Sequence, residues 1–258
     1  MSNAPLALIT GAGRGIGRAV AEALAPDHVL LLAGRDRNVL DRTRAELTTP
    51  HGAHVLAVDL GDPASRASFL SEVTGLEDQL GARVQVLVNN AGAALSAPLA
   101  RTGDDAWARL LELNCTAPFV LTRALVPGML AAGWGRVVNV ASTAAIKGYA
   151  YTAAYSASKA GLLGWTRALA VELASKDVTV NAVCPGFTDT DIVADAARNI
   201  QATTGRSEDE ARKALARFSP QGRLRSPAEV ADLVVWLARR GAGGVTGQAL
   251  AIDGGETA

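Results

Sequence analysis

A short apolar run, a glycine cluster and a helical pattern follow one another at the start of the chain, and this order constrains the fold most. The run 6–9 stops at glycine, and 18–24 has helical periodicity. Strand, tight turn and helix are therefore predicted. Glycines let the backbone approach a pyrophosphate, and a helix N-terminus offers free N–H donors. The spacing Gly11-x-x-x-Gly15-x-Gly17 is neither the commonest dinucleotide fingerprint nor a P-loop, yet its context favours nucleotide binding over a structural turn.

The same alternation of apolar runs and helical patterns continues to the end of the chain. Further strands are expected at 29–33, 54–58, 84–88, 136–140, 178–183 and 249–252, and helices at 38–47, from 63 onward, at 104–129, at 160–174 and from 227 onward. Strands that alternate with helices indicate a parallel sheet with helices on both faces. We expect an α/β protein: one Rossmann-type, doubly wound domain over 1–258 with about seven strands.

Composition excludes several classes of function. The 258 residues include 25 basic and 25 acidic side chains, so nothing suggests nucleic acid or an anionic membrane as the main partner. No apolar run approaches the roughly 18 residues of a membrane span. The segment 1–5 does not read as a signal peptide. Cys115 and Cys184 lie in apolar segments and fit buried, reduced thiols better than a disulfide or a metal site. A cytoplasmic protein without a metal is expected.

The end of the second strand bears on the choice of dinucleotide. An acidic residue there would bind a ribose 2′-hydroxyl, but Gly34 holds that place and Arg35 follows it. An arginine suits a 2′-phosphate, and Arg14 in the glycine turn could reach the same group. NADP is therefore favoured over NAD. Asp36 keeps NAD open, and the two arginines could be ordinary surface charges.

Polar residues also follow the third and fourth strands. Asp59 could accept a hydrogen bond from an adenine amino group, whereas Asp62 fits an N-cap for the helix that starts at Pro63. The segment 89–92, Asn-Asn-Ala-Gly, lies at the strand end where ligands bind in doubly wound sheets. A turn-forming role alone is the alternative for this segment.

Tyr155 and Lys159 form the most chemically suggestive pair in the sequence. On a helix, residues four apart share one face, which brings an ammonium group near a phenol. A nearby cation favours the phenolate and lowers the tyrosine pKa from about 10. With Ser142 to hold an oxygen atom, the group suits proton transfer to a carbonyl or from an alcohol. A chance pair with a solvated lysine is the alternative. Asn114, inside a helical pattern, needs partners or marks a local distortion.

Taken together, these motifs resemble the classical short-chain dehydrogenase/reductase family from end to end. The matching elements are Thr10-Gly11-x-x-x-Gly15-x-Gly17, Asp59, Asn89-Asn90-Ala91-Gly92, Asn114, Ser142, Tyr155-x-x-x-Lys159, Pro185-Gly186 with Thr190, and Asp253-Gly254-Gly255. One departure is the turn 26–28, Pro-Asp-His, which lacks the family's usual glycine and is one residue shorter. That departure leaves the start of the second strand uncertain.

The resemblance implies a role for each matching residue. Tyr155 would donate the proton, Lys159 would lower its pKa and bind the nicotinamide ribose, Ser142 would polarise the carbonyl, and Asn114 would hold a relay water. Thr190 would bond the carboxamide of the cofactor. The implied cofactor-binding set is Gly11, Arg14, Gly15, Ile16, Gly17, Arg35, Asp59, Leu60, Asn90, Ala91, Gly92, Tyr155, Lys159, Pro185, Gly186, Thr188 and Thr190.

The catalytic half most resembles bacterial 3-oxoacyl thioester reductases and polyketide ketoreductases. This implies reversible reduction of a 3-oxoacyl thioester to the 3-hydroxyacyl form. The alternatives are a ketoreductase or alcohol dehydrogenase for a free small, cyclic or steroid ketone, and a dinucleotide-binding sensor or scaffold. Proteins of the last kind typically lack the tyrosine or the lysine, and both are present here.

The segment 189–220 is the least generic, and the resemblance implies that it covers the substrate as a lid. Ser207 and Glu210 resemble a capping box and predict a helix from about residue 208. Its basic side chains could suit coenzyme A or an acyl carrier protein, although a solvated face balanced by acids is equally compatible. These side chains are Arg206, Arg212, Lys213 and Arg217. The resemblance also implies a homotetramer, with the helices that contain Asp104 and Tyr155 and the last strand at its interfaces.

Overall fold

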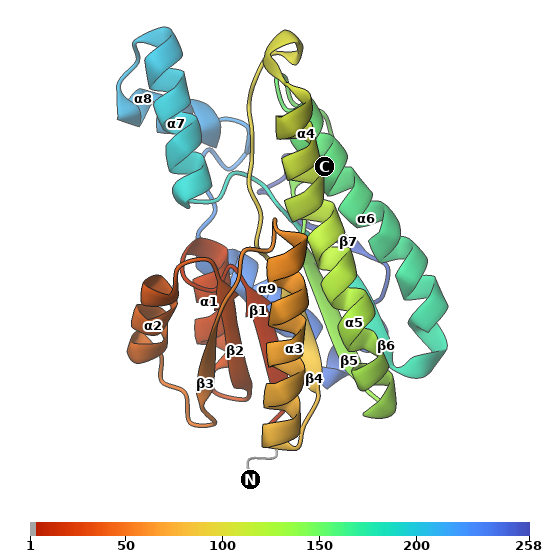
Figure 1. Cartoon of the computed structure of the whole chain (residues 1–258). Helices are drawn as coiled ribbons and strands as arrows, with labels where there is room; N and C mark the ends of the chain where they lie inside the picture. The colour runs from red at the N-terminus through yellow and green to blue at the C-terminus, as the bar shows by residue number, and fades with distance from the viewer. Residues whose placement is uncertain (1–3) are drawn as a thin grey trace.

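One parallel sheet forms the centre of the computed structural model, which describes residues 4–258 (Figure 1). Its strands are β1 (Leu6–Thr10), β2 (Val29–Gly34), β3 (Ala53–Ala57), β4 (Val84–Asn89), β5 (Gly135–Val140), β6 (Val178–Pro185) and β7 (Ala249–Ile252). They are ordered β3-β2-β1-β4-β5-β6-β7, and all neighbours are parallel. The predicted doubly wound α/β fold and its strands are confirmed.

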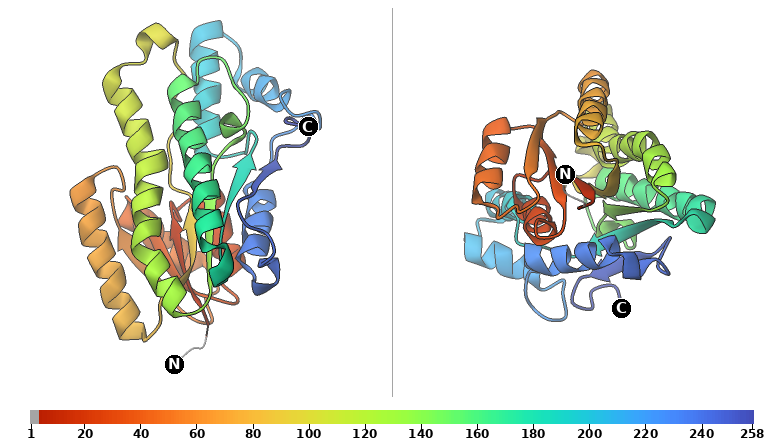
Figure 2. Two further views of the ribbon diagram at one scale, coloured as in Figure 1. Left: turned by 90° about the vertical axis from the view of Figure 1, so that its right-hand side faces the viewer. Right: turned by 90° about the horizontal axis from the view of Figure 1, so that it is seen from below.

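Helices cover both faces of this sheet. They are α1 (Gly15–Leu24), α2 (Arg37–Glu46), α3 (Pro63–Leu80), α4 (Asp104–Leu111), α5 (Ala117–Ala131), α6 (Ala153–Leu173), α7 (Asp191–Thr204), α8 (Glu208–Ala216) and α9 (Pro227–Ala238). Figure 2 shows α3, α5 and α6 side by side over one face, with α9 on the other. The predicted helix 104–129 is two helices, α4 and α5, joined by a π-helical turn, Glu112–Thr116.

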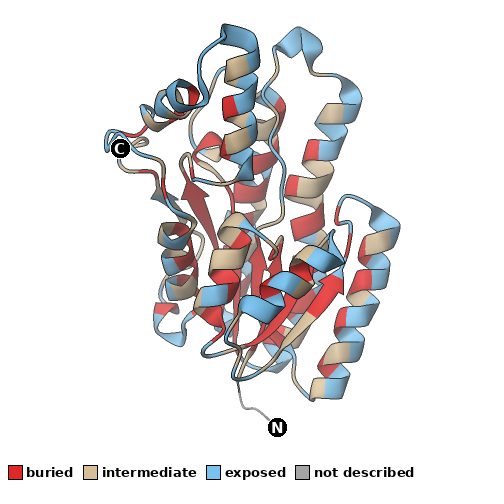
Figure 3. Cartoon of the chain, turned by 90° about the vertical axis from the view of Figure 1, so that its left-hand side faces the viewer, coloured by how far each residue is buried: buried red, intermediate tan, exposed pale blue. Residues whose placement is uncertain are grey.

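The apolar side chains of each strand divide between two cores. In β1, Leu6 and Leu8 pack on the side of α3 and α5, while Ala7 and Ile9 pack on the side of α1 and α9. Both faces are buried, so the strands read as continuous apolar runs, whereas each helix buries one stripe (Figure 3). The short turn 26–28 does not displace β2, because Val29 pairs with Leu6 and its N–H donates to Pro5 O at 3.0 Å.

The order of the strands determines where a ligand can bind. From β1 the chain winds outward to β2 and β3, then returns to place β4 on the other side of β1. The carboxyl ends of β1 and β4 therefore diverge at the switch point, where open α/β sheets form a binding crevice. Helices α7 and α8 lie beyond these strand ends (Figure 1). Within residues 4–258, none of the helices has the length and apolar character needed to cross a bilayer.

Candidate active site

Thr10 and Asn90 join the two strand ends at the switch point. The Thr10 hydroxyl donates to Val88 O at 3.3 Å and accepts from the backbone N–H groups of Asn90 (2.9 Å) and Ala91 (3.0 Å). In return, Asn90 Nδ2 donates to Thr10 O at 2.8 Å and to Gly11 O at 3.3 Å. The Asn90 side chain thus holds the glycine turn in place. Thr10 was given no role of its own from the sequence.

The glycine turn is packed too tightly for side chains. A Cβ on Gly17 would lie 2.1 Å from Gly11 O and 2.5 Å from Asn90 Nδ2, so only glycine allows α1 to start against the turn. Gly11 and Gly15 have φ values of +67° and +52°, in the left-handed region that glycine adopts most readily. Ile16 packs against the core between α1 and the sheet. The predicted order of strand, glycine turn and helix is confirmed, and it brings the helix N-terminus to the crevice.

The three charged residues expected to discriminate between dinucleotides differ in their surroundings. Arg14, the N-cap residue of α1, forms a 2.8 Å ion pair with Asp191 at the start of α7. Arg35 is exposed just after β2. The Asp36 carboxylate caps α2 by accepting from the N–H groups of residues 38 and 39 at 2.9 and 3.2 Å. Oδ1 of Asp36 is therefore used to start α2.

The loop after β3 carries Asp59 and Leu60. Asp59 Oδ1 accepts from Gly61 N at 2.9 Å, which shapes the loop. Leu60 O accepts from Arg66 Nη1 at 2.6 Å, and Arg66 Nη2 lies 2.5 Å from Glu112 Oε1. The buried Arg66 therefore links this loop to the π turn, a connection that sequence reasoning missed. The predicted N-cap role of residue 62 is confirmed by its side-chain bonds to the first turn of α3.

Asn114 lies in the π turn and is fully buried. Its Oδ1 accepts from Ala93 N at 2.9 Å, and its Nδ2 donates to Ala93 O at 2.8 Å and to Ser158 Oγ at 3.0 Å. A Cβ on Gly92 would lie 2.9 Å from Asn114 Oδ1. The expected partners and the expected helix distortion are therefore both present. π turns of this kind are frequent at functional sites.

Ser142 and Tyr155 meet beyond the carboxyl end of β5. The two side chains are close enough for the Ser142 hydroxyl to act on the pKa of the Tyr155 phenol, and Ser142 Oγ accepts from Ala144 N at 3.1 Å. The sequence predicted a lowered tyrosine pKa, and that direction is wrong for this structure. Burial raises the pKa of Tyr155, and the Ser142 hydroxyl only partly opposes the shift. The phenol of Tyr155 is therefore protonated at neutral pH.

Lys159 is buried one turn further along α6. Its Nζ donates to Val140 O at 2.8 Å and lies 3.4 Å from the position that a Cβ on Gly92 would take. Burial lowers the pKa of Lys159 to about 8. Lys159 is thus anchored to the end of β5, where it faces the segment after β4. A group that titrates there can exchange a proton near neutral pH.

A network of side-chain hydrogen bonds joins β4 and β5 near their carboxyl ends. Asn89 and Asn139 are paired in register on β4 and β5, and Asn89 Nδ2 donates to Asn139 Oδ1 at 2.8 Å and to Thr122 Oγ1 at 3.2 Å. Asn139 Nδ2 donates to Thr166 Oγ1 on α6 at 2.8 Å. These contacts tie two strands to two helices. Sequence reasoning gave Asn139, Thr122 and Thr166 no role, although an asparagine in each of two adjacent apolar runs was a usable signal.

Pro185, Gly186, Thr188 and Thr190 lie where β6 leads into α7. Gly186 N donates to the backbone of β7 at 3.0 Å, Thr188 Oγ1 donates to Gly186 O at 3.0 Å, and Thr190 Oγ1 donates to Thr188 O at 3.2 Å. The loop is therefore ordered by its own hydroxyl groups. A Cβ on Gly15 would lie 3.1 Å from Thr190 Cγ2, so the glycine turn and this loop are adjacent.

The segment 189–220 forms α7 and α8. The predicted capping box of Ser207 and Glu210 is confirmed at the start of α8. Two of its basic side chains are neutralised, because Arg212 pairs with Asp189 and Lys213 with Asp209, each at 2.6 Å. These pairs favour the balanced, solvated helix face over a concentrated basic surface.

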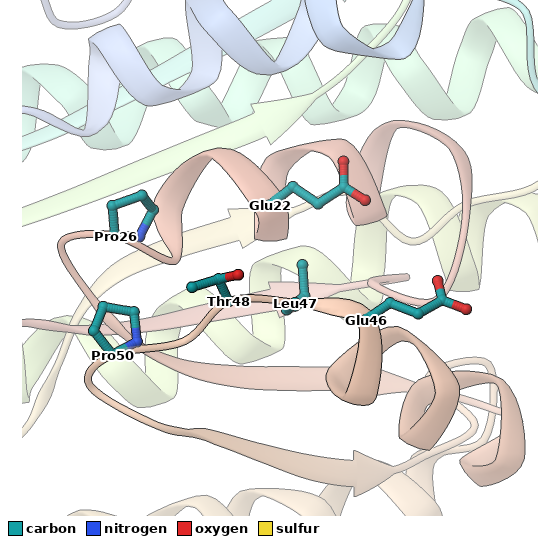
Figure 4. Close-up of a pocket in the computed structure, with 6 residues that line it drawn as sticks. All are labelled: Glu22, Pro26, Glu46, Leu47, Thr48 and Pro50. Carbon is teal, nitrogen blue, oxygen red and sulfur yellow. The ribbon is translucent and has the colours of Figure 1, made fainter.

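Two cavities lie near the first helix. One of about 340 Å³ is lined by Glu22, Pro26, Glu46, Leu47, Thr48 and Pro50, beside the ends of α1 and α2 (Figure 4). It contains no residue of the predicted site. The other, of about 430 Å³, borders Gly15 and Thr190 together with Asp189, Asp191 and the start of α9. Both cysteines are free thiols, and burial raises the pKa of Cys184 to about 11, which leaves that thiol unreactive.

Comparison with known proteins agrees with this geometry. The family model for short chain dehydrogenases matches residues 5–201. The 3-oxoacyl-[acyl-carrier-protein] reductase FabG of Vibrio cholerae is 37% identical over 257 residues, covering 97% of this chain and 96% of that protein. A crystal structure of an actinorhodin polyketide ketoreductase variant with NADPH superimposes with a TM-score of 0.90 at 35% identity, covering 98% and 97% of the two chains.

A second solved structure has the same fold over its whole length. YwfH, an NADPH dependent reductase involved in bacilysin biosynthesis, gives a TM-score of 0.90 at 25% identity and covers 99% of each chain. The family model and the near-complete coverage of these relatives lead to one conclusion: the chain belongs to the short-chain dehydrogenase family.

Proposed function

We propose that this protein reduces a 3-oxoacyl thioester to the 3-hydroxyacyl thioester with NADPH. The observation that carries the proposal is the meeting of Ser142, Tyr155 and Lys159 at the carboxyl end of β5, beside the switch point of the sheet. The similarity to a 3-oxoacyl reductase and to a polyketide ketoreductase supports the choice of substrate.

The crevice fits a dinucleotide. Gly11, Gly15 and Gly17 keep the glycine turn and the first residues of α1 free of side chains, and Gly92 places no Cβ beside Asn114 and Lys159. The start of α1 offers its unpaired N–H groups to a pyrophosphate. Ala91, Pro185, Gly186, Thr188 and Thr190 would line the nicotinamide half, and Asp59 with Leu60 the adenine half. Asn90 would act through the backbone that it holds.

The reaction needs a hydride and a proton. When bound, the reduced nicotinamide supplies the hydride that attacks the carbonyl carbon. As the C=O electron pair moves onto oxygen, Tyr155 donates its proton there, and the alcohol forms. Ser142 donates a hydrogen bond to the same oxygen and stabilises its developing charge. Lys159, whose pKa is lowered by burial to about 8, would then return a proton towards Tyr155, and a water held at Asn114 would resupply Lys159.

NADP is the proposed cofactor rather than NAD. Arg35 is exposed at the end of β2, and Arg14 lies in the glycine turn. A guanidinium offers planar, charge-assisted donors to a 2′-phosphate. The carboxylate that could have bound a 2′-hydroxyl, Asp36, caps α2. Two structural neighbours are described with NADPH, which supports this choice.

The remaining parts of the proposal concern organisation and partners. The chain would act as one domain over 1–258, with 189–220 as the lid over the substrate. The substrate would be carried on coenzyme A or an acyl carrier protein. A homotetramer in the cytoplasm is proposed from the family resemblance and from two thiols kept reduced.

The decisive experiment is to follow NADPH absorbance with acetoacetyl-coenzyme A, acetoacetyl-acyl carrier protein and a panel of free ketones. Reduction of either thioester with a higher kcat/KM than any free ketone is expected. Turnover of free ketones alone would replace the thioester assignment with a ketoreductase for free substrates. Absence of turnover across the whole panel, with NADPH and with NADH, would contradict enzymatic carbonyl reduction.

A further inference from the structure

Glu256 is a carboxylate buried outside the proposed catalytic group. Its side chain is 1% exposed. The C-terminal tail, residues 253–258, is folded inward by Asp253. The carboxylate of Asp253 accepts from Gly255 N at 2.9 Å, from Thr257 N at 2.9 Å and from Thr257 Oγ1 at 2.6 Å. Asp253 is thereby committed to the turn, and Glu256 is left to face the interior.

The partners of Glu256 come from the segment after the catalytic serine. Its Oε1 accepts a hydrogen bond from the hydroxyl of Tyr149 and lies 3.2 Å from Lys147 Nζ, which also donates to the backbone oxygen of Glu256 at 3.4 Å. Lys147 Nζ lies 5.0 Å from the centre of the Tyr149 ring as well. Glu256 Oε2 is buried with no hydrogen-bond partner among residues 4–258. A buried carboxylate with an unsatisfied oxygen depends on a cation nearby, and Lys147 is that cation.

This ion pair lies close to the catalytic serine. Lys147 N donates to Thr143 O at 2.9 Å, so the chain after Ser142 folds back on itself. Thr143 Oγ1 is 2.7 Å from the Tyr149 hydroxyl. Because the single phenol proton goes to the carboxylate, the threonine hydroxyl donates to the phenol oxygen. The network therefore reaches from the tail to the residue next to Ser142.

The same tyrosine connects the network to the segment above the strand ends. Its ring packs edge-on against Phe187, just past β6, with centroids 6.0 Å apart, and against Phe218, just past α8, at 5.7 Å. Tyr149 thus lies between the residues after Ser142, the end of β6 and the segment 189–220, and Lys147, whose side chain is 35% exposed, lies beside its ring. A free cation beside that ring would attract an anionic substituent of the substrate.

We infer that Glu256 is a specificity-determining residue. Its carboxylate neutralises Lys147 and so makes the site select carbonyl substrates with an uncharged substituent over those with an anionic one. This inference rests on the proposed carbonyl reduction at Ser142 and Tyr155. The proposed carbonyl reduction does not itself require Glu256, so selection by substrate charge is a separate function of the tail.

Two ketones of similar size but different charge, methyl acetoacetate and the acetoacetate anion, test the inference. The measured quantity is the ratio of their kcat/KM values with NADPH. The wild type is expected to prefer the ester, and Glu256→Gln should shift the ratio towards the anion by roughly tenfold, because Lys147 becomes uncompensated. The double variant Lys147→Met with Glu256→Gln should lose that shift. Glu172→Gln, on the exposed face of α6, is the matched control and should leave the ratio unchanged.

A purely structural role for Glu256 would lower both kcat/KM values together and leave their ratio unchanged. A ratio for Glu256→Gln within about twofold of the wild-type ratio would therefore overturn the inference, as would a shift that persists in the double variant. If Glu256→Gln does not fold, Lys147→Gln gives an opposite test. It leaves the carboxylate uncompensated and should move the ratio further towards the ester, and an unchanged ratio would again overturn the inference.

The outcome is separable from that of the proposed function. Turnover of methyl acetoacetate without turnover of acetoacetyl-coenzyme A would remove the thioester assignment and leave the charge selectivity measurable. Where neither ketone turns over, calorimetric binding of the same two compounds to the enzyme with NADP⁺ gives the ratio directly. Equal binding of both compounds by the wild type and by Glu256→Gln would overturn the inference.

Discussion

Asn114 Nδ2 donates a 3.0 Å hydrogen bond to Oγ of Ser158, and this bond fastens the π turn to the helix that carries Tyr155 and Lys159. Ser158 Oγ in turn donates to Tyr155 O at 2.7 Å. The amide of Asn114 is otherwise used by the backbone of Ala93. One buried side chain therefore fixes the position of α6 relative to the π turn and the path of the chain after β4.

Replacement of that side chain should be costly to stability. Asn114→Ala removes three hydrogen bonds made by a fully buried side chain, at about 1 kcal/mol each, and we expect a loss of about 2–4 kcal/mol in the free energy of unfolding. Ser158→Ala removes the link between the π turn and α6 together with the local bond to Tyr155 O, and should cost about 1 kcal/mol. Urea unfolding of both variants checks this order. A smaller loss for Asn114→Ala than for Ser158→Ala would contradict the assigned contacts.

Removal of the tyrosine hydroxyl should stop proton transfer and leave cofactor binding intact. Tyr155→Phe keeps the ring in place, and turnover should fall by about 10²–10⁴-fold, the usual contribution of a positioned acid. Tyr151→Phe is the control, since Tyr151 is exposed and should keep full activity. Steady-state kinetics and NADPH fluorescence titration give the two quantities. Turnover of Tyr155→Phe within a few-fold of the control would exclude the tyrosine as the proton donor.

The proposed preference for NADPH should depend on the two arginines near the ends of β1 and β2. Arg35→Ala and Arg14→Ala should each raise the KM for NADPH by roughly tenfold, with little change for NADH, because only NADPH carries a 2′-phosphate. Asp191→Asn removes the surface ion pair of Arg14 and should cost less than about 1 kcal/mol in stability. Comparison of both cofactors across the three variants measures the effect. An equal rise in both KM values would refute recognition of the 2′-phosphate.

Lys159 should make stability depend on pH in a defined direction. Burial lowers its pKa to about 8 in the folded protein, whereas a lysine in the unfolded chain has a pKa of about 10.4. Between these values the unfolded chain binds more protons, so the contribution of Lys159 to the free energy of unfolding rises with pH. Below both values this gain is absent. The unfolding free energy of the wild type minus that of Lys159→Met should therefore increase from pH 7 to pH 10.

Chemical denaturation at several pH values between 7 and 10 provides that difference, and the titrations shared by both proteins cancel. A constant difference over the whole range would mean that Lys159 has an ordinary pKa in the folded state. A decreasing difference would mean that its pKa is raised rather than lowered.

The fold was predictable because its signals are local. The buried strands, the glycine turn and the capping box of Ser207 and Glu210 each depend on a few adjacent residues, and the structure confirms them. Asn114 was singled out as a polar residue in a helical pattern, but its π turn depends on partners at positions 93 and 158, far away in the sequence. Such long-range contacts leave no periodic pattern for a single sequence to show.

Electrostatics was predicted less well than geometry. The spacing of Tyr155 and Lys159 correctly places them on one helix, yet the direction of the tyrosine pKa was wrong because the extent of burial cannot be read from spacing. The ion pair of Arg14 was not predicted from the sequence either. Its side chain is paired with Asp191, a residue that the sequence offered no reason to bring near it.

The asparagine and threonine network that joins β4, β5, α5 and α6 implies unequal resistance to local opening. The backbone amide protons of the residues in this network should be among the slowest to exchange with deuterium. Exposing any of them to water requires breaking contacts between several strands and helices. Helices α7 and α8 share only a small apolar cluster of their own and should exchange much earlier. If a substrate enters and leaves when those two helices open, the hydrogen-bond network at the ends of β4 and β5 should remain intact during each opening.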